Sequence, residues 1–546
     1  MQISASSTTQ RGGGMAYKWL VAIVVIFGIF MTILDGTIVN VAIPRLQTAF
    51  GADLNSVQWI LTAYTLAQGV ATPLTAYLAN RFGTKRLYLF ALAAFTIGSA
   101  LCGLAWSLPV LIIFRILQGM AGAFLVPLSI TMLYQVFPPE ERGTAMGALG
   151  IPILLAPAFG PTLGGYIVTF ASWQLIFYIN VPIGIVGVIL AVLFLSQGAA
   201  EARHSFDLPG FLLSAVGLAA LLYGLSDAST DGWGSAKVLG CLITGVVLLT
   251  IFTIVELRTA RRGGQPLLDL RVFANGPFTS SNIASILVTF SLYGGLFIIP
   301  VYLQSLRGLS AYQSGLILLP QAFASMVAVV VGGRLVDKFG VRAVVLPGLI
   351  LLGISLWQFT SLSLSLPYGQ FQLVQIIRGF GIGLCMQPLT VSSLAEIKPR
   401  MLAQASSVNT TLRFVASSLA VSLIATLVQT QSKIHYSALA GQVTADSPLG
   451  QLVTRLQALF VARGASLGAA RSTTLQIISG LVHRQAAILA MQDAFWLSLL
   501  LTGVALIATF FVRSRKREQV PTEPGPLTDV EKEEEEKARE EALLAI

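Results

Sequence analysis

Asp35 is the residue in this sequence whose position most needs a chemical explanation. It lies in the stretch LDGTIVNVAIP (residues 34–44), which closes a hydrophobic run that begins near Tyr17. At about 1.5 Å of rise per helical residue, its carboxylate would lie well below a membrane surface. An ionised carboxylate at that depth costs about 2.5–3.5 kcal/mol, so such residues usually mark an ion path or a polar partner.

Two interpretations of Asp35 follow from this position. A carboxylate exposed alternately to each side of a membrane can load and release a proton, because burial and nearby cations change its proton affinity in opposite directions. The alternative is a structural carboxylate that is hydrogen-bonded to a neighbouring helix. We expect Asp35 to be the only deep carboxylate, because Glu256, Glu396 and Asp493 lie near predicted helix ends, where water is close.

Arg115 is the second charged residue inside a hydrophobic run. Its charge and donors cannot stay unpaired in lipid, so we expect it to face the bundle interior and to pair with a carboxylate, backbone carbonyls or water. It would then either polarise a proton path together with Asp35 or act as a structural hydrogen-bonding hub. Arg378 and Arg413 raise the same question.

The run 147–165 combines small residues with prolines. Small residues let helix backbones approach closely, and proline interrupts helical hydrogen bonding, so the run predicts a pliable, closely packed interface suited to alternating access. Tight packing without motion is the alternative. The candidate motif residues are Gly147, Ala156, Gly160, Pro161, Gly164 and Gly165, with further prolines at 152 and 157.

The sequence does not contain the residue patterns of several common kinds of chemistry. The sequence has no GxxxxGK[ST] phosphate-binding loop, its three histidines lack metal-ligand spacing, and no nucleophile triad can be assembled. We therefore expect no enzymatic activity, no metal and no cofactor, with a proton as the coupling ion.

The composition predicts an all-α protein that crosses a membrane many times. Hydrophobic residues make up 55% of the 546 residues and charged residues only 11%, against about 25% charged in soluble proteins. The net charge of +10 lies in short loops, where it sets orientation in the bilayer, so it does not indicate a nucleic-acid partner.

Lys and Arg gather in the predicted inward loops, which places both termini in the cytoplasm. Fourteen membrane helices are predicted, at 17–42, 56–78, 86–105, 108–134, 143–169, 174–196, 208–226, 237–257, 277–304, 310–335, 342–364, 367–394, 402–430 and 489–512.

A repeat divides these helices into two six-helix halves. Residues 76–83 (AYLANRFG) are echoed by 333–340 (GRLVDKFG), and residues 115–119 (RILQG) are echoed by 375–379 (QIIRG). Such repeats are typical of transporters, whose substrate sites lie near the midplane between the halves. The predicted substrate-cavity residues are Gln68, Gln118, Asn180, Asn282 and Gln387.

The predicted organisation is a disordered N-terminus (1–16), a first bundle (17–200), two inserted membrane helices (201–265), a second bundle (266–512) and a charged cytoplasmic tail (513–546).

Residues 431–488 form one long outward segment between the last two predicted helices. Apolar residues recur there at helical spacing, as in Leu452, Leu456 and Leu459, so part of the segment should be an amphipathic helix. This helix would either lie on the membrane over the outer mouth or provide a docking surface for a periplasmic partner.

Taken together, these motifs resemble those of the major facilitator superfamily, and within it the fourteen-helix drug:proton antiporters of the EmrB/QacA type. Asp35 fills the acidic position of the helix-one motif, and Arg115 fills the arginine position of the helix-four motif. The run 147–165 matches the helix-five antiporter motif, except that Ala156 replaces a glycine, and PLLDLR (266–271) resembles the cytoplasmic linker of this group.

The chain departs from the family in the loop after the second predicted helix. The usual Asp is Asn80 here, beside Arg81 and Gly83, while the second copy keeps its acid at Asp337, before Gly340. A charged latch at the inward gate is therefore expected only in the second half. Asn80 could instead cap the following helix.

The resemblance implies a proton-driven multidrug efflux antiporter in a bacterial inner membrane. It would export small lipophilic, amphipathic or cationic drugs by alternating access between two six-helix bundles. A periplasmic adaptor protein, bound through 431–488, would be a further partner besides the lipid bilayer. Two alternatives stay open, an exporter of a specific lipid or metabolite on the same fold and a non-transporting membrane sensor or assembly component.

Overall fold

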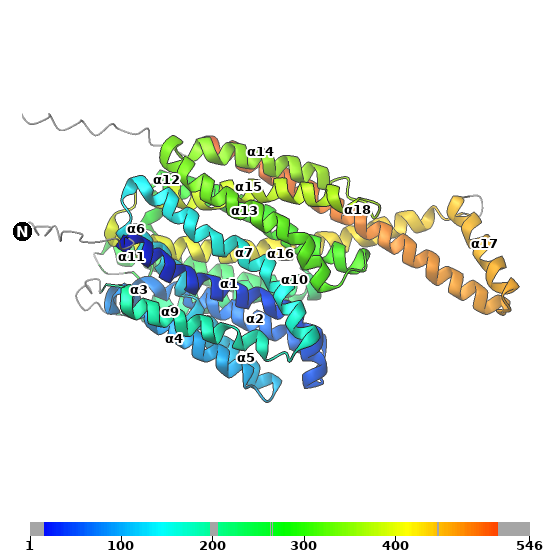
Figure 1. The fold of residues 1–546 in the computed structure, drawn as a ribbon, viewed down its shortest axis with the longest axis horizontal. Coiled ribbons are helices and arrows are strands. Elements are labelled where there is room, and N and C mark those ends of the chain that lie inside the picture. The colour runs from blue at the N-terminus through cyan, green and yellow to red at the C-terminus, as the bar shows by residue number, and fades with distance from the viewer. Residues whose placement is uncertain (1–15, 197–205, 263, 265, 445–446, 512–546) are drawn as a thin grey trace, which may run out of the picture. The chain divides into compact units, whose positions relative to one another are not determined.

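A computed structural model describes residues 16–196, 206–262, 264, 266–444 and 447–511 of this chain. The predicted disordered N-terminus up to residue 15 and the predicted cytoplasmic tail lie outside the described residues. The described residues belong to a single compact unit, and Figure 1 shows that it consists of helices running close to a common direction.

Thirteen described segments are long and apolar enough to cross a membrane. They correspond to the predicted spans, although the last two are far longer than predicted. The exception is 56–78, where two shorter helices follow each other and break at Thr72 and Pro73. With this broken span, the described helices account for the fourteen predicted crossings. Their bounds are α1 Tyr17–Phe50, α2 Leu54–Ala71, α3 Leu74–Phe82, α4 Thr84–Gly103, α5 Leu108–Gly122, α6 Leu125–Val136, α7 Arg142–Phe170, α8 Leu175–Tyr178, α9 Asn180–Phe194, α10 Leu208–Asp231, α11 Ala236–Arg261, α12 Gly276–Val301, α13 Ala311–Phe339, α14 Val341–Phe359, α15 Tyr368–Leu394, α16 Leu402–Gly441, α17 Pro448–Ala462 and α18 Leu467–Phe511, with short η turns at Pro139–Glu141, Leu270–Ala274, Tyr302–Leu306 and Pro399–Met401.

The sequence repeat corresponds to a repeated turn. Gly83 separates α3 from α4 with φ of 83°, and Gly340 separates α13 from α14 with the same φ. Only glycine adopts this backbone conformation readily, so the two copies need it at the same place. Asn80 lies inside α3, and α4 begins without a side-chain cap, so the expectation that Asn80 caps the following helix is wrong.

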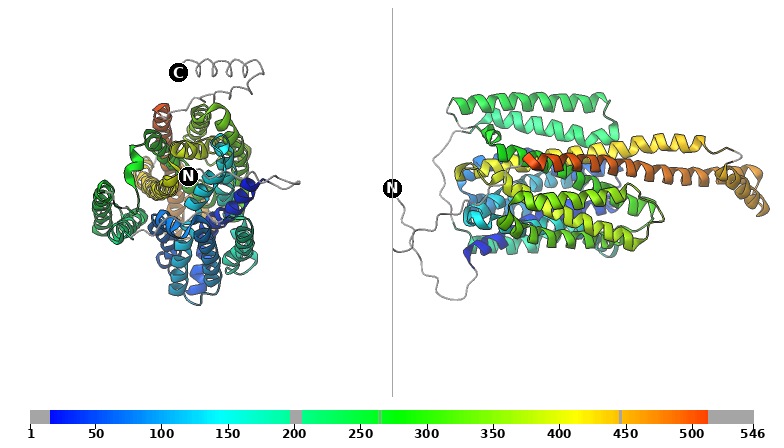
Figure 2. Two further views of the ribbon diagram at one scale, coloured as in Figure 1. Left: turned by 90° about the vertical axis from the view of Figure 1, so that its left-hand side faces the viewer. Right: turned by 90° about the horizontal axis from the view of Figure 1, so that it is seen from above.

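The segment 431–488, predicted as a long outer loop with one amphipathic helix, is mostly helical, and α17 contains the residues predicted for that helix. α16 continues to Gly441 and α18 begins at Leu467, so both are far longer than their predicted spans, and α17 joins them. Figures 1 and 2 show the two long helices side by side, projecting beyond the bundle, with α17 at the tip. His435 pairs with Asp493 at 2.8 Å, and the Tyr436 and Ser479 hydroxyls are 3.0 Å apart. Helix pairing therefore continues well past the length that a bilayer requires.

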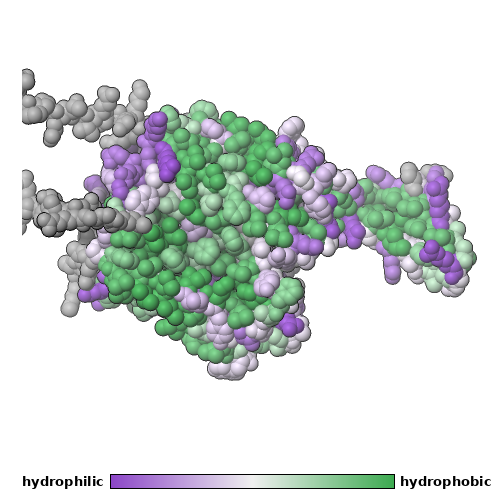
Figure 3. Space-filling model, viewed as in Figure 1, coloured by the Kyte–Doolittle hydropathy of each residue, from purple (hydrophilic) through white to green (hydrophobic). Residues whose placement is uncertain are grey.

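The face of the bundle seen in Figure 3 carries hydrophobic residues over most of its length. Hydrophilic residues gather toward its two ends and on the hairpin, which is the part of α16, α17 and α18 that projects beyond the bundle. This pattern is the one expected of helices that meet lipid along their middle and water at their ends.

The inserted helices α10 and α11 pack on each other at one side of the bundle (Figure 2). α10 also contacts both halves. Tyr223 stacks on Trp59 of α2 at a centroid distance of 5.6 Å, and the Trp233 indole N–H donates to Thr426 of α16 at 2.8 Å. The pair therefore bridges one helix from each half.

The two halves are joined most extensively by α7 and α13. At the end of this contact, the Asp337 carboxylate accepts hydrogen bonds from the backbone N–H groups of Gly143 and Thr144, at 2.7 and 2.8 Å, and from the Thr144 hydroxyl at 2.6 Å. These amides belong to the first turn of α7, where N–H groups lack helical partners and negative charge is favoured. The acid of the second half thus caps a helix of the first half.

Gly333 provides a test of this contact. A Cβ at Gly333 would lie 2.4 Å from the Gly143 carbonyl oxygen. We expect Gly333→Ala to lower the thermal unfolding temperature of the detergent-purified protein, because overpacking costs about 1–3 kcal/mol. Gly503→Ala is the matched control, since nothing lies within 4 Å of a Cβ there. Equal unfolding temperatures for the two variants would contradict the close packing of α7 and α13.

Candidate functional site

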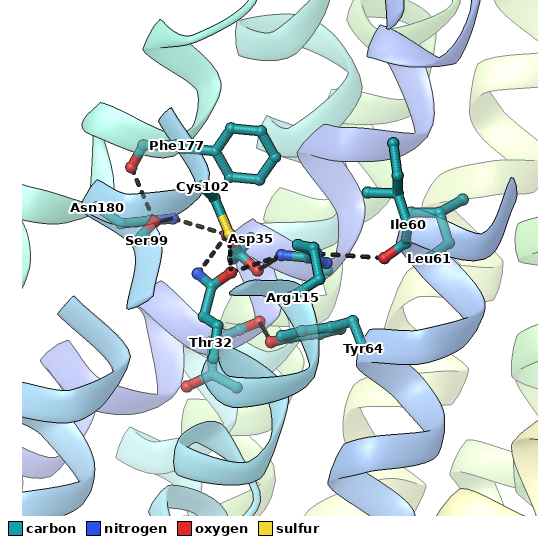
Figure 4. Close-up of polar contacts among 12 residues, drawn as sticks. Thr32, Asp35, Ile60, Leu61, Tyr64, Ser99, Cys102, Arg115, Phe177 and Asn180 are labelled. Atoms are coloured by element: carbon teal, nitrogen blue, oxygen red, sulfur yellow. Dashed lines mark hydrogen bonds and ion pairs between the residues drawn. The ribbon is translucent and has the colours of Figure 1, made fainter. Parts of the chain in front are cut away.

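Asp35 lies on α1 in the interior of the first half, where side chains from α5 and α9 reach it. The side chain has no exposed surface. Arg115 of α5 donates from Nη1 to Asp35 Oδ2 at 2.5 Å. Gln118 of α5 and Asn180 of α9 donate to Asp35 Oδ1 at 3.0 and 2.8 Å. A cation and two amides therefore surround the carboxylate (Figure 4).

Arg115 is held from several directions, as Figure 4 shows. Its Nε donates to the Ile60 carbonyl at 3.2 Å, and its Nη1 also donates to Gln118 at 2.9 Å. The Tyr64 ring lies against the guanidinium, with its centroid 3.8 Å from Cζ, which adds a cation–π contact. The prediction that Arg115 faces the interior and pairs with a carboxylate and a backbone carbonyl is confirmed.

A second layer of polar groups positions the partners of Asp35. The Asn180 amide also donates to Ser99 at 3.0 Å, and Ser99 donates to the Phe177 carbonyl at 2.9 Å. Tyr64 donates to the Thr32 carbonyl at 3.1 Å and receives a hydrogen bond from Gln68 at 2.9 Å. Sequence reasoning missed Tyr64 and Ser99. The sequence signal that could have found such residues is the helical spacing of polar residues in an apolar run, as between Tyr64 and Gln68.

The five predicted cavity residues separate into groups. Gln118 and Asn180 contact Asp35 directly, and Gln68 reaches the network through Tyr64. Asn282, in the second half, accepts from Asn409 at 3.0 Å. Gln387 is buried, and its amide has no hydrogen-bond partner among the described residues. All five are buried, so a cavity-lining role stays a prediction for each.

The helix-five motif lies against the site. A Cβ at Gly160 would lie 2.3 Å from the Thr37 hydroxyl, two residues from Asp35, and one at Gly164 would lie 2.8 Å from Ile38. On its other face, α7 brings Gly147 and Gly165 against α13. The Thr37 hydroxyl donates a hydrogen bond to the Ala156 carbonyl at 3.4 Å. The predicted close packing is confirmed, and it places α7 between the helix of Asp35 and the second half.

The second half lacks an equivalent ion pair among the described residues. Arg378 is fully buried, but its Nη2 donates only to the Ser291 and Leu292 carbonyls of α12, at 3.0 and 3.2 Å. A Cβ at Gly295 would overlap the guanidinium, so glycine leaves room for Arg378 in this position. The charge chemistry of the site therefore belongs to the first half.

The expectation that water lies close to Glu256 is wrong, so Asp35 is not the only buried carboxylate. Glu256 of α11 has 1% exposed surface, although it lies only five residues from the end of its helix. Sequence position suggested nearby water. The linker that follows α11 folds back over this carboxyl, since Leu267 and Leu268 are buried beside it.

Asp35 has a clear chemical capability. A carboxylate that accepts charge-assisted hydrogen bonds is well stabilised, and adding a proton to Asp35 would have to replace its contact with Arg115. Because the site is sealed in this structure, a proton could reach it only after α1, α5 or α9 moves. Protonation of this group would therefore require a change in helix packing.

Comparison with known proteins agrees with this arrangement. Residues 25–421 match the sequence model of the Major Facilitator Superfamily. The chain is 35% identical to the uncharacterized MFS-type transporter YhcA of Bacillus subtilis, over 92% of this chain and 96% of that protein. It is 30% identical to the multidrug export protein EmrB of Escherichia coli, over 88% of this chain and 91% of EmrB. The proton:xylose symporter XylE superposes with a TM-score of 0.58, covering 92% of this chain and 97% of its own, and at 14% identity this likeness concerns the fold alone.

A double-mutant cycle tests the ion pair. We expect Asp35→Asn and Arg115→Gln each to destabilise the protein, because each leaves a buried charge unpaired. The double variant should lose less free energy of unfolding than the two single variants together. The interaction energy from denaturant unfolding should be about 1–3 kcal/mol. The partly exposed Lys18–Glu141 pair is the control, and its coupling should stay within about 1 kcal/mol. Strict additivity at Asp35 and Arg115 would refute the ion pair.

Proposed function

Since this chain belongs to the Major Facilitator Superfamily and is a transport protein, not an enzyme, we propose that it is a proton-driven multidrug efflux antiporter. It exports small lipophilic, amphipathic or cationic compounds by alternating access. The observation that carries the proposal is the sealed pair of Asp35 and Arg115 in the first half. The drug-export relatives support the substrate class.

Protonation of Asp35 is the coupling step in this proposal. A proton arriving from outside neutralises the carboxylate and releases Arg115, which keeps its contacts with the Ile60 carbonyl and the Tyr64 ring. The neutral Asp35 no longer holds α1 to α5 by charge, so the two helices can move apart. A membrane potential of 100 mV contributes about 2.3 kcal/mol for each charge that crosses, which is enough to bias such a change.

α7 transmits the change to the second half in this proposal. It packs on α1 through Gly160 and Gly164 and on α13 through Gly147, and its first turn is capped by Asp337. A shift of α1 therefore acts on a helix whose start is held by the acid of the opposite half. Asn80, Arg81 and Gly83 form the counterpart of this gate that lacks an acid, and Asp337 with Gly340 forms the one that keeps it.

The location of the protein is also part of the proposal. The Lys and Arg bias of its loops supports cytoplasmic termini in a bacterial inner membrane. The hairpin formed by the outer parts of α16 and α18 with α17 would then stand in the periplasm. Its exposed apolar side chains, Ile434, Leu459 and Leu467 among them, offer a helical surface for an adaptor protein.

Transport by the Asp35→Asn variant tests the proposed function. In inverted vesicles, drug uptake driven by an imposed proton gradient should be abolished, because asparagine cannot carry the proton. Asparagine keeps the shape and an acceptor for Arg115, so the protein should stay folded by size-exclusion chromatography. Asp227→Asn is the matched control, since Asp227 is an acid of α10 that pairs with Lys237.

Two results would overturn the proposal. Undiminished proton-driven uptake in the Asp35→Asn variant would remove Asp35 from the coupling step. Failure of the unaltered protein to move protons with any of several lipophilic drugs would reject multidrug antiport altogether.

A further inference from the structure

Two carboxyl groups meet where the inserted helices α10 and α11 lie beside the linker to the second half. Glu256 of α11 is 1% exposed, and neither of its oxygens has a hydrogen-bond partner among the described residues. Asp207 precedes α10, and its Oδ1 accepts from the Gly210 N–H at 2.9 Å, while its buried Oδ2 likewise lacks a partner. Unpaired buried carboxylate oxygens are costly, so this arrangement needs an explanation.

Gly210 shows how close the two groups are. A Cβ at Gly210 would lie 2.4 Å from Glu256 Oε1 and 2.6 Å from Asp207 Oδ2, so these two oxygens lie within about 5 Å of each other. Any side chain at this position would fill the space that the carboxyl groups occupy. The glycine therefore keeps a small polar space open between the start of α10 and the last turns of α11.

No described cation neutralises this pair. The acid that faces Glu256 from α10 is Asp207, and the linker contributes the backbone N–H groups of Leu267 and Leu268, which lie beside its carboxyl without ordinary hydrogen-bond geometry. Arg258 and Arg261 lie in the last turn of α11, and the structure pairs neither with Glu256 or Asp207. Glu256 is buried and Asp207 is partly exposed, and two adjacent carboxyl groups at such a place repel each other when both are ionised.

The nearby linker acid is already neutralised. Burial alone would raise the pKa of Asp269, but the hydrogen bonds and charge of Arg271 outweigh burial and hold that pKa below its usual value. Arg271 donates to Asp269 Oδ2 at 2.6 Å, so this cation is committed within the linker. Among the described residues, Asp207 and Glu256 remain as the pair without a counter-charge.

We propose that Asp207 and Glu256 form a proton-binding site, in which the carboxylic acid of one group donates a hydrogen bond to the carboxylate of the other. The ligand of this site is a single proton. The site is separate from Asp35, because it lies on the inserted helices and shares no contact with the Arg115 network. It does not depend on the proposed drug transport.

The proton would also hold the linker in place. Leu267 and Leu268 are 2% and 4% exposed, packed beside Glu256, and the Asp269 N–H donates to Gln404 of α16 at 2.9 Å. The linker is thus fixed on one side to α11 and on the other to the second half. Loss of the shared proton leaves two negative charges, whose repulsion separates the start of α10 from α11 and frees the linker.

Infrared spectroscopy of the purified full-length protein tests the shared proton. We expect a protonated-carboxyl C=O stretch at neutral pH that is missing from both Glu256→Gln and Asp207→Asn, because an amide partner removes the shared acid. The band should disappear from the unaltered protein as the pH rises. Glu396→Gln is the matched control, because Glu396 is an exposed acid, and the band should stay. A spectrum that is the same in all four proteins would overturn the proposal.

Hydrogen exchange of the amides of residues 267–269 tests the link to the linker. In the pH range above that in which the pair loses its proton, the exchange rate of these amides in the unaltered protein should rise with pH. The rise should exceed that of intrinsic exchange by about tenfold per pH unit. Glu256→Gln, which imitates the protonated group, should keep the protection. Equal loss of protection in that variant would reject the latch. Sodium binding by calorimetry, with no acid band, would assign the pair to a metal cation and overturn the proton site.

Discussion

The buried ion pair between Asp35 and Arg115 is the constraint on which the first half depends. A charge of either sign is costly at that depth, so each needs the other, and the two amides of Gln118 and Asn180 complete the environment. These contacts draw α1, α5 and α9 to one point, and the Ile60 carbonyl adds α2. Any change in the protonation of Asp35 must therefore alter how these helices pack.

The helix-five motif connects this pair with the contact between the halves. Its glycines allow α7 to touch α1 and α13 at backbone distance, and the acid of the second half caps its first turn. The two halves share their turns but differ in their charges. Arg378 stands at the position of Gln118 in the repeat, Gln375 stands at that of Arg115, and Arg378 has no acid partner among the described residues. Asn80 repeats the position of Asp337 without its charge. The fold repeat therefore carries an asymmetric distribution of charge.

The inserted helices take part in this arrangement, since α10 contacts α2 of the first half and α16 of the second. The Asp207–Glu256 pair lies where these helices meet the linker, at a place that must adjust if the halves move. A protonation site there would act on the connection between the inserted helices and the second half, whereas Asp35 would act inside the first half.

The sequence by itself determined the helices and the charged residues that had to be buried, because hydropathy sets membrane spans and an arginine in an apolar run has few tolerable environments. It also identified the repeated glycine turn and the close packing of the helix-five motif. Only the tertiary structure decided which groups meet. Gln118 and Asn180 contact Asp35 because α5 and α9 cross α1 at that level, and the sequence does not encode this level locally. Glu256 was misplaced because burial depends on the linker that folds over it, and the 431–488 segment was misjudged because α16 and α18 support each other beyond the length that a membrane explains.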